Sequence, residues 1–142
     1  MVKKHKLDPE TRYRVMSSIK SVNTKPEIIF RKTLWSMGVR GWRCHVVNLP
    51  GKPDLAFKRN KLAIFVDGVW WHGHPKYFKL GSKGAYWDKK IQGNKKRDSK
   101  NNKILRKMGW KVLRIWDIDI LSNPTKQANL VIKRLNKLNQ PQ

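Results

Sequence analysis

Two aspartates and a histidine are the residues of this chain best suited to chemistry. Asp54 ends the turn "LPGKPD", Asp67 lies in "FVDG", and His72 follows two tryptophans in "WWHGH". Carboxylate oxygens suit Mg²⁺, which often shares its coordination shell with phosphate oxygens. A bound cation also activates water and neutralises charge on a departing oxygen, while a histidine can take up a proton near neutral pH. Together these residue types indicate metal-assisted cleavage of a phosphodiester.

Each of these residues also has an ordinary structural explanation. An aspartate after Gly-Lys-Pro is often a turn residue, and a single histidine is often no more than a hydrogen-bonded polar group. Glu27, near a predicted helix start, can simply favour that helix N-terminus. The ordered combination is therefore a stronger signal than any one of its members.

A predicted hairpin would bring the two aspartates to the same side of a sheet. The short apolar runs "DLAF" and "LAIFV" are separated by "KRNK", a pattern typical of two antiparallel strands. If the loop closes symmetrically, Phe57 lies opposite Leu62, Asp54 lies opposite Phe65, and opposed residues share a face. Asp67, two residues after Phe65, would then point the same way as Asp54. A loop one residue longer or shorter would break this relation.

The remaining pattern predicts a single α/β domain over residues 1–142, with a basic N-terminal arm at about residues 1–10. Helix-start residues, apolar periodicity and glycine stops predict the helices, and runs of β-branched and aromatic residues predict the strands. We expect helices at 8–20, 24–38, 99–109 and 125–138, and strands at 43–49, 54–57, 62–66 and 110–116. This order predicts one small sheet with helices packed on it.

The charge of the chain indicates a polyanionic partner. Thirty-three Lys and Arg stand against nine Asp and Glu, a formal net charge of +24, and such an excess favours DNA or RNA binding. The single cysteine excludes a disulfide framework and a cysteine-based zinc cage. With no apolar run long enough for a membrane span and no signal-peptide pattern, we expect a cytoplasmic protein. A basic nucleic-acid-binding protein without chemistry remains an open alternative.

Aromatic residues lie among the basic ones. Residues 76–107 hold twelve Lys or Arg but only two acids, and two adjacent tryptophans precede this segment. Basic side chains can meet phosphates while rings stack on bases or wedge between them. The alternatives are a solvated helix face for the lysines and core packing for the tryptophans. The candidate DNA-binding residues are Trp70, Trp71, Trp87, Lys89, Lys90, Lys95, Lys96 and Arg97.

Five segments of the chain resemble, in order and spacing, the very-short-patch mismatch repair endonucleases. They are "MSSIKSVNTKPEIIFRKTLWSMG", "LPGKPDLAF", "AIFVDGVWWHGH", "YWDKKIQGNKKRD" and "GWKVLRIW", and the resemblance covers residues 11–119. It implies membership of the PD-(D/E)xK nuclease superfamily, a restriction-endonuclease-like mixed sheet flanked by helices, and Mg²⁺-dependent nicking beside the thymine of a T:G mismatch. Related homing-type endonucleases, which cut both strands, are the alternative within the same pattern.

The resemblance also implies a role for each matching residue. Asp54 and the backbone carbonyl of Val66 would hold the metal, and His72 would be the general base, assisted by Asp67. Glu27 and Asp98 match the outer acidic positions, and Trp70 and Trp71, with Trp87 as a further ring, match aromatics that wedge into DNA beside the mismatch. Phe65 stands where the superfamily has a second metal-binding acid, so the metal shell would be completed by waters and phosphate.

The chain departs from the family at its structural zinc site. The four matching positions are Val69, His74, Lys76 and Ile118, of which only His74 can ligate zinc. We therefore expect no structural zinc, and expect the loop at 68–81 to be anchored by Trp71, Tyr77 and Phe78 packing on the sheet. The expected partner is mismatched double-stranded DNA bound by a monomer, with a functional link to a cytosine methyltransferase or to mismatch-repair proteins.

Overall fold

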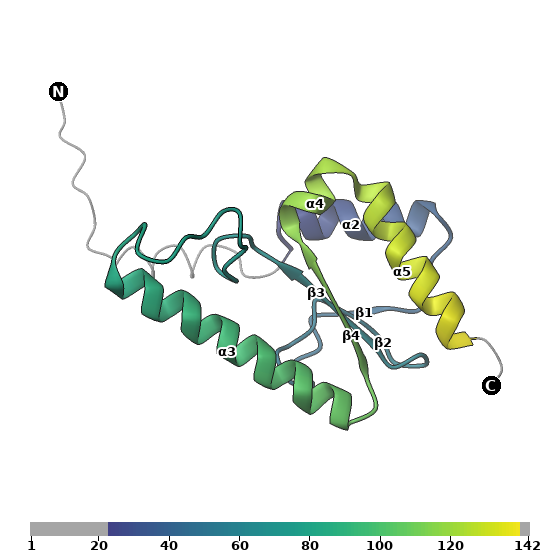
Figure 1. The fold of residues 1–142 in the computed structure, drawn as a ribbon. Helices are drawn as coiled ribbons and strands as arrows, with labels where there is room; N and C mark the ends of the chain where they lie inside the picture. Colours follow the sequence, from purple (N-terminus) through teal and green to yellow (C-terminus); the bar gives the residue numbers. More distant parts are fainter. Residues whose placement is uncertain (1–22, 140–142) are drawn as a thin grey trace.

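The structure is a computed structural model that describes residues 23–139 (Figure 1). The predicted helix at 8–20 and the basic arm lie outside these residues. The elements are α2 (Lys25–Ser36), β1 (Arg43–Cys44), β2 (Leu55–Phe57), β3 (Leu62–Asp67), α3 (Ala85–Lys107), β4 (Lys111–Trp116), α4 (Asp117–Ser122) and α5 (Pro124–Asn139). The four strands form one sheet in the order β1-β2-β3-β4. The predicted α/β architecture, with a small mixed sheet flanked by helices, is confirmed.

The sheet has the predicted hairpin register. β2 and β3 pair antiparallel with Phe57 opposite Leu62, which is the register that a symmetric "KRNK" loop requires. β3 and β4 are parallel, and Asp67 at the end of β3 lies beside Trp116 at the end of β4. The chain leaves the end of β3, passes through a loop and α3, and returns to β4. Side chains of the loop and of α3 can therefore meet those at the end of β3.

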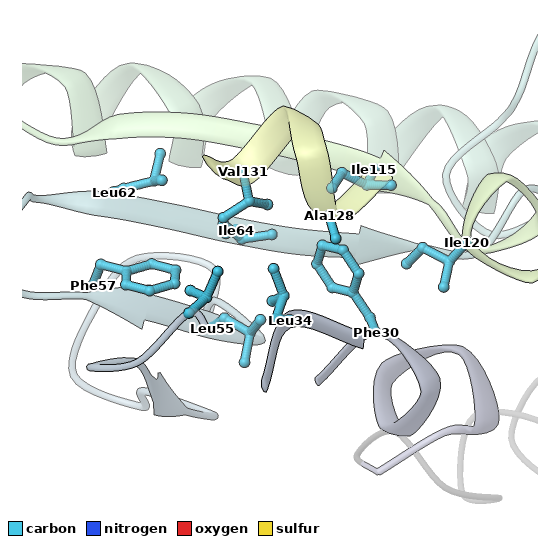
Figure 2. Packing of buried hydrophobic residues seen from close by; sticks show 11 residues of the cluster. Phe30, Leu34, Leu55, Phe57, Leu62, Ile64, Ile115, Ile120, Ala128 and Val131 are labelled. Atoms are coloured by element: carbon cyan, nitrogen blue, oxygen red, sulfur yellow. The ribbon is translucent and has the colours of Figure 1, made fainter. Parts of the chain in front are cut away.

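The two faces of the sheet are covered by different helices. Side chains of one parity pack against α2, α4 and α5, as Figure 2 shows; this core contains Phe30, Leu34, Leu55, Phe57, Leu62, Ile64, Ile115, Ile120, Ala128 and Val131. Side chains of the other parity, among them Ala63 and Phe65, pack with Leu105 of α3 and with Trp110. Of the helices between residues 23 and 139, α3 is the one that Figure 1 shows on this side of the sheet. Alternation along β3 therefore directs Asp67, like Phe65, towards α3.

Two predicted boundaries were wrong, and one short helix was not predicted. α3 begins at Ala85 rather than at residue 99, because Trp87 and Ile91 pack and hold a lysine-rich, glycine-containing first half that has little apolar periodicity of its own. β1 ends after two residues instead of running to residue 49, since the chain turns at His45, which has a φ of 51°. The short helix α4, with Ile120 buried, was not predicted. None of the helices between residues 23 and 139 is long and apolar enough to cross a membrane.

Candidate active site

His72 lies between two carboxylates from different elements. Its Nδ1 is 2.5 Å from Oδ2 of Asp98 on α3, and its Nε2 is 3.7 Å from Oδ1 of Asp67 at the end of β3. The structure thus brings His72 together with Asp98, which lies 26 positions further along the chain, and with Asp67. Asp98, which the sequence suggested only as an outer acidic position, makes the shorter contact with the histidine. A neutral ring that donates Nδ1–H to Asp98 leaves the Nε2 lone pair free to accept a proton.

Arg114 completes this cluster and was missed in the sequence. Its Nη1 donates to both carboxylate oxygens of Asp67, at 3.0 and 3.2 Å, and lies 3.6 Å from Asp98. Its guanidinium also covers the ring of Phe65, its partner in the parallel register, at 4.0 Å. An arginine inside the apolar strand "WKVLRIW" was the available signal, because a buried-strand arginine needs a carboxylate partner.

Burial and charge shift the acid–base behaviour of the cluster. Burial raises the pKa of Asp67, although the positive charges of His72 and Arg114 work against this rise. Burial alone would lower the pKa of His72, but the hydrogen bond that His72 donates to Asp98 and the negative charges of Asp67 and Asp98 outweigh it and raise that pKa above 6.5. The imidazole is therefore a stronger base here than in water.

Asp54 belongs to a second, neighbouring cluster. Its Oδ2 accepts the backbone N–H of Val66 at 2.6 Å, and its carboxylate lies within 4.8 Å of ligand atoms of Glu27 and His45. Glu27 is only 4% exposed, and its Oε2 accepts the N–H of Asn23 at 2.9 Å. Burial, with smaller contributions from the charges of Glu27 and Asp67, raises the pKa of Asp54 to about 7. His45 in this cluster was not among the residues predicted from the sequence.

This second cluster has the donor set of a divalent-cation site. The charge of Glu27 adds to the effect of burial in raising the pKa of Asp54, because two neighbouring carboxylates repel each other when both are ionised. A divalent cation would relieve that repulsion, and carboxylate oxygens suit a hard ion. Asp54 and Glu27 therefore fit the metal that the sequence predicts, with Asp54 turned towards the backbone of Val66.

The three predicted wedge tryptophans form one aromatic cluster. The ring centroids of Trp70 lie 5.2 Å from Trp71 and 4.6 Å from Trp87, and Trp71 and Trp87 are 5.9 Å apart. Trp87 is 5% exposed, whereas the other two are half-buried. In this conformation Trp87 supports Trp70 and Trp71, which are the members with accessible surface.

The loop that carries His72 is fixed against α3 at two points. Asn94 donates its side-chain N–H to the carbonyl of Trp71 at 3.0 Å. Gly73 has a φ of 68°, and a Cβ at that position would lie 2.7 Å from Cδ of Lys95 and 3.0 Å from Ile91. Only glycine meets both the positive φ and the close approach, so Gly73 allows the loop to place His72 against Asp98.

The predicted basic contacts lie on different sides of α3. The stem of Lys95 packs at Gly73, beside the loop that carries His72. Lys89 and Lys96 are two turns apart and share one exposed line of the helix, and Lys90 and Arg97 share another. Lys95 is therefore the one of these five residues that the structure places at the active-site loop.

The four positions that match the family's zinc ligands lie close together and are joined by hydrogen bonds. Oδ1 of Asp117 accepts the backbone N–H groups of Val69, at 3.3 Å, and Ile118, at 2.7 Å. Nδ1 of His74 accepts the N–H of Lys76 at 3.0 Å. A side-chain carboxylate at the start of α4 thus connects the loop to the end of β4.

The predicted aromatic anchoring of this loop is realised differently. Tyr77 is 43% exposed and its ring contacts His74 at 5.2 Å, and it is the ring of His74 that packs on Trp116 of β4, at 4.6 Å. Trp71 packs with Trp70 and Trp87. Tyr77 thus contacts His74, which in turn contacts the sheet, while packing of Trp71 and Phe78 on the sheet stays a prediction.

We expect Asp117→Ala to lower the free energy of unfolding by about 1–3 kcal/mol, the cost of leaving backbone donors without their acceptor. Asp117→Asn keeps an acceptor oxygen and should lose less. Thermal unfolding of both variants, followed by circular dichroism, measures the difference.

Because the loop is held by Asp117 and His74, a chelator should leave the thermal midpoint of the unmodified chain unchanged. One zinc per chain by elemental analysis, with unfolding when it is removed, would contradict this account.

Comparisons with known proteins identify the family of this chain. A family model described as DNA mismatch endonuclease Vsr matches residues 4–77. The chain is 42% identical over 125 residues to the Type II nicking enzyme V.HpaIIP of Haemophilus parainfluenzae, covering 85% of this chain and 88% of that protein. It is 39% identical over 129 residues to the Type II nicking enzyme V.NmeDIP of Neisseria meningitidis serogroup C, covering 89% and 86%. It is also 32% identical over 132 residues to the DNA mismatch endonuclease Vsr of Escherichia coli strain K12, covering 92% and 84%. The chain therefore belongs to the family of Vsr-type DNA endonucleases.

Proposed function

We propose that this endonuclease nicks one strand of duplex DNA beside a T:G mismatch, as a step of very-short-patch repair. The position of His72, between Asp67 and Asp98 and next to the Asp54 cluster, is the observation that supports this proposal most strongly. Relatives named nicking enzymes and a relative named a mismatch endonuclease support nicking and mismatch recognition respectively. The functional link to a cytosine methyltransferase or mismatch-repair proteins is part of the same proposal, as is action by a monomer.

His72 would act as the general base. With Nδ1–H donated to Asp98, Nε2 takes a proton from the attacking water, and the carboxylate of Asp67 at 3.7 Å stabilises the imidazolium that results. The water oxygen forms a bond to phosphorus, the scissile P–O bond breaks, and the leaving oxygen takes a proton from solvent. Arg114 orients Asp67 through its two hydrogen bonds and favours the ionised form of this carboxyl.

Asp54 and the carbonyl of Val66 would hold a Mg²⁺ ion, with Glu27 beside them. When bound, such an ion acts as a Lewis acid towards the phosphate and lowers the pKa of water. Asp54 must lose its proton to serve as a ligand, and its pKa of about 7 makes metal binding stronger as the pH rises through that value.

The tryptophan cluster would recognise the mismatch. A mismatched step is easier to unstack than a paired one, so rings that enter the stack there gain selectivity as well as affinity. Trp70 and Trp71 have the accessible surface for this contact, whereas Trp87 packs beneath them. The active-site histidine follows Trp71 directly, which would bring the scissile phosphate next to the opened step.

We expect Trp70→Ala and Trp71→Ala to weaken binding to a T:G duplex more than binding to a matched duplex, by about 1–3 kcal/mol for each stacking residue. Trp87→Ala should have the same effect, because Trp70 and Trp71 would lose the ring that packs against them. Lys96→Ala is the control: it should weaken binding to both duplexes alike and reduce the dependence of log K on log salt by about one. Fluorescence anisotropy with the two duplexes measures all four effects. Equal losses on both duplexes from the tryptophan variants would contradict mismatch wedging.

Two alternatives make different predictions. A homing-type enzyme would cut both strands, and a basic DNA-binding protein would cut neither. Incubating the full chain and Mg²⁺ with T:G and matched duplexes, each labelled separately on both strands, distinguishes them. Nicking of one strand only beside the thymine of the T:G duplex is the expected product. Cleavage of both strands, or of matched DNA at an equal rate, would contradict the proposal.

A further inference from the structure

His45 is held in an unusual backbone conformation next to Asp54. Its φ of 51° lies in the left-handed region, which residues other than glycine seldom adopt. Its N–H donates to the carbonyl of Asp54 at 3.1 Å, and the N–H of Val46 donates to the carbonyl of Pro53 at 3.2 Å. These two hydrogen bonds continue the β1–β2 pairing past the end of β1 and fix the direction in which the ring of His45 leaves the chain.

The ring of His45 faces the carboxylates of the second cluster. Its Nε2 is 3.7 Å from Oε2 of Glu27 and 3.3 Å from Oδ1 of Asn23. One ligand atom each of Glu27, His45 and Asp54 lie within 4.8 Å of one another. Two oxygens and one nitrogen from three separate parts of the chain therefore converge on one point.

The other acid–histidine cluster is a poorer place for a cation. Arg114 already supplies a positive charge there, 3.0 Å from Asp67 and 3.6 Å from Asp98. In the second cluster Arg31 lies 3.5 Å from Glu27, but Asp54 accepts a backbone N–H and makes no ion pair with a described Lys or Arg. The Asp54 cluster thus retains negative charge that a cation can neutralise.

We propose that His45 is a ligand, through Nε2, of the cation held by Asp54 and Glu27, so that the site binds imidazole-preferring ions such as Co²⁺ or Ni²⁺ more tightly than Mg²⁺. This rests on the proposed function, which places the metal at Asp54. Imidazole nitrogen suits these transition metals, whereas Mg²⁺ takes oxygen ligands. The ring would carry its proton on Nδ1 and exchange the Nε2 contact with Asn23 for the metal.

Metal titration of the full chain without DNA tests this ligand independently of cleavage. Co²⁺ binding, followed by its visible absorption and by calorimetry, should weaken at least about tenfold in His45→Gln, the loss typical when a metal's supporting group is removed. Mg²⁺ binding to the same variant should change less than about threefold, because glutamine removes only the nitrogen donor. His74→Gln is the matched control, since His74 packs on Trp116, and it should leave both affinities unchanged.

A second measurement identifies the nitrogen directly. In the Co²⁺-loaded chain, the ring protons of a coordinated histidine show large paramagnetic shifts in NMR spectra. Those signals should be absent in His45→Gln and present in His72→Gln. The reverse pattern would overturn the proposal, as would equal losses of Co²⁺ and Mg²⁺ affinity in His45→Gln or no loss of either.

Asp54→Ala separates failure of this inference from failure of the proposed function. It should weaken the binding of both Co²⁺ and Mg²⁺, because both ions need its carboxylate. If Asp54→Ala binds both ions as well as the unmodified chain, the metal site of the proposed function is wrong. If Asp54→Ala loses both and His45→Gln loses neither, only the role of His45 is wrong. Circular dichroism of each variant confirms that the fold is retained.

Discussion

Replacing Asp54 with alanine is expected to abolish divalent-metal-dependent DNA cleavage while leaving DNA binding largely intact. Asp54 is the proposed metal ligand, and without it Glu27 would be the one carboxylate of this cluster left to bind the ion. DNA affinity comes mainly from basic and aromatic side chains, which this change does not touch. Cleavage of a labelled T:G duplex and anisotropy on the same duplex measure the two properties. Robust cleavage by a folded Asp54→Ala chain would reject Asp54 as the metal ligand.

Asp54→Asn is the control for folding. It removes the same carboxylate, but it should stabilise the fold at high pH, so a loss of cleavage in this variant cannot be due to unfolding. The pKa of Asp54 is raised from 3.8 to about 7 by burial and by Glu27. In the metal-free chain, ionising this half-buried carboxyl removes stability as the pH rises from about 4 to about 7. Asparagine remains neutral and can still accept the N–H of Val66, so at pH 8 the variant should be more stable by about 1–3 kcal/mol. Denaturant unfolding at pH 4 and pH 8 should show a gain only at the higher pH.

The second large effect is expected from His72→Ala, which should slow cleavage by about 10²- to 10⁴-fold, the usual cost of losing a general base. The hydrogen bond with Asp98 and the charge of Asp67 hold the pKa of His72 above 6.5. The base is active only when deprotonated, so the rate of the unmodified enzyme should rise with pH through a value above 6.5. Single-turnover rates of nicking of the T:G duplex between pH 5 and 8 measure this rise, which is the acidic limb of the pH–rate profile.

Saturating metal is needed to assign that limb to His72. Below saturation, deprotonation of Asp54 would also make the rate rise with pH, because metal binding depends on it. With the metal saturated, His72→Ala should show a nearly flat profile. Asp98→Asn should retain the limb but move it to lower pH, since the charge that raises the pKa of His72 is removed. An unchanged profile in His72→Ala would mean that another group is the base.

The sequence alone was sufficient for the parts of the site that depend on local geometry. The "KRNK" loop and the alternation of the two flanking runs predicted the register of Phe57 and Leu62, because strand parity is set by the turn. The order of "LPGKPD", "FVDG" and "WWHGH" predicted the catalytic residue types and the family. Charge predicted the class of partner, since 33 basic residues cannot be balanced within a chain that has nine acids.

Tertiary structure decided which acid meets which side chain. Asp98 and His72 are far apart in the sequence, and their contact depends on α3 extending back to Ala85 and on the close approach at Gly73. Local propensity hid the first half of α3, because its lysines and Gly93 carry little apolar periodicity and packing of Trp87 and Ile91 holds it.

Three residues had no signal strong enough to identify them before folding. Arg114, His45 and Asp117 find their partners only when β4 pairs with β3, when the chain turns after β1, and when α4 begins beside the active-site loop. Each contact joins positions that lie 9 to 48 residues apart. Sequence spacing determines such contacts only within one helix or hairpin; beyond that, the packing of the elements decides them.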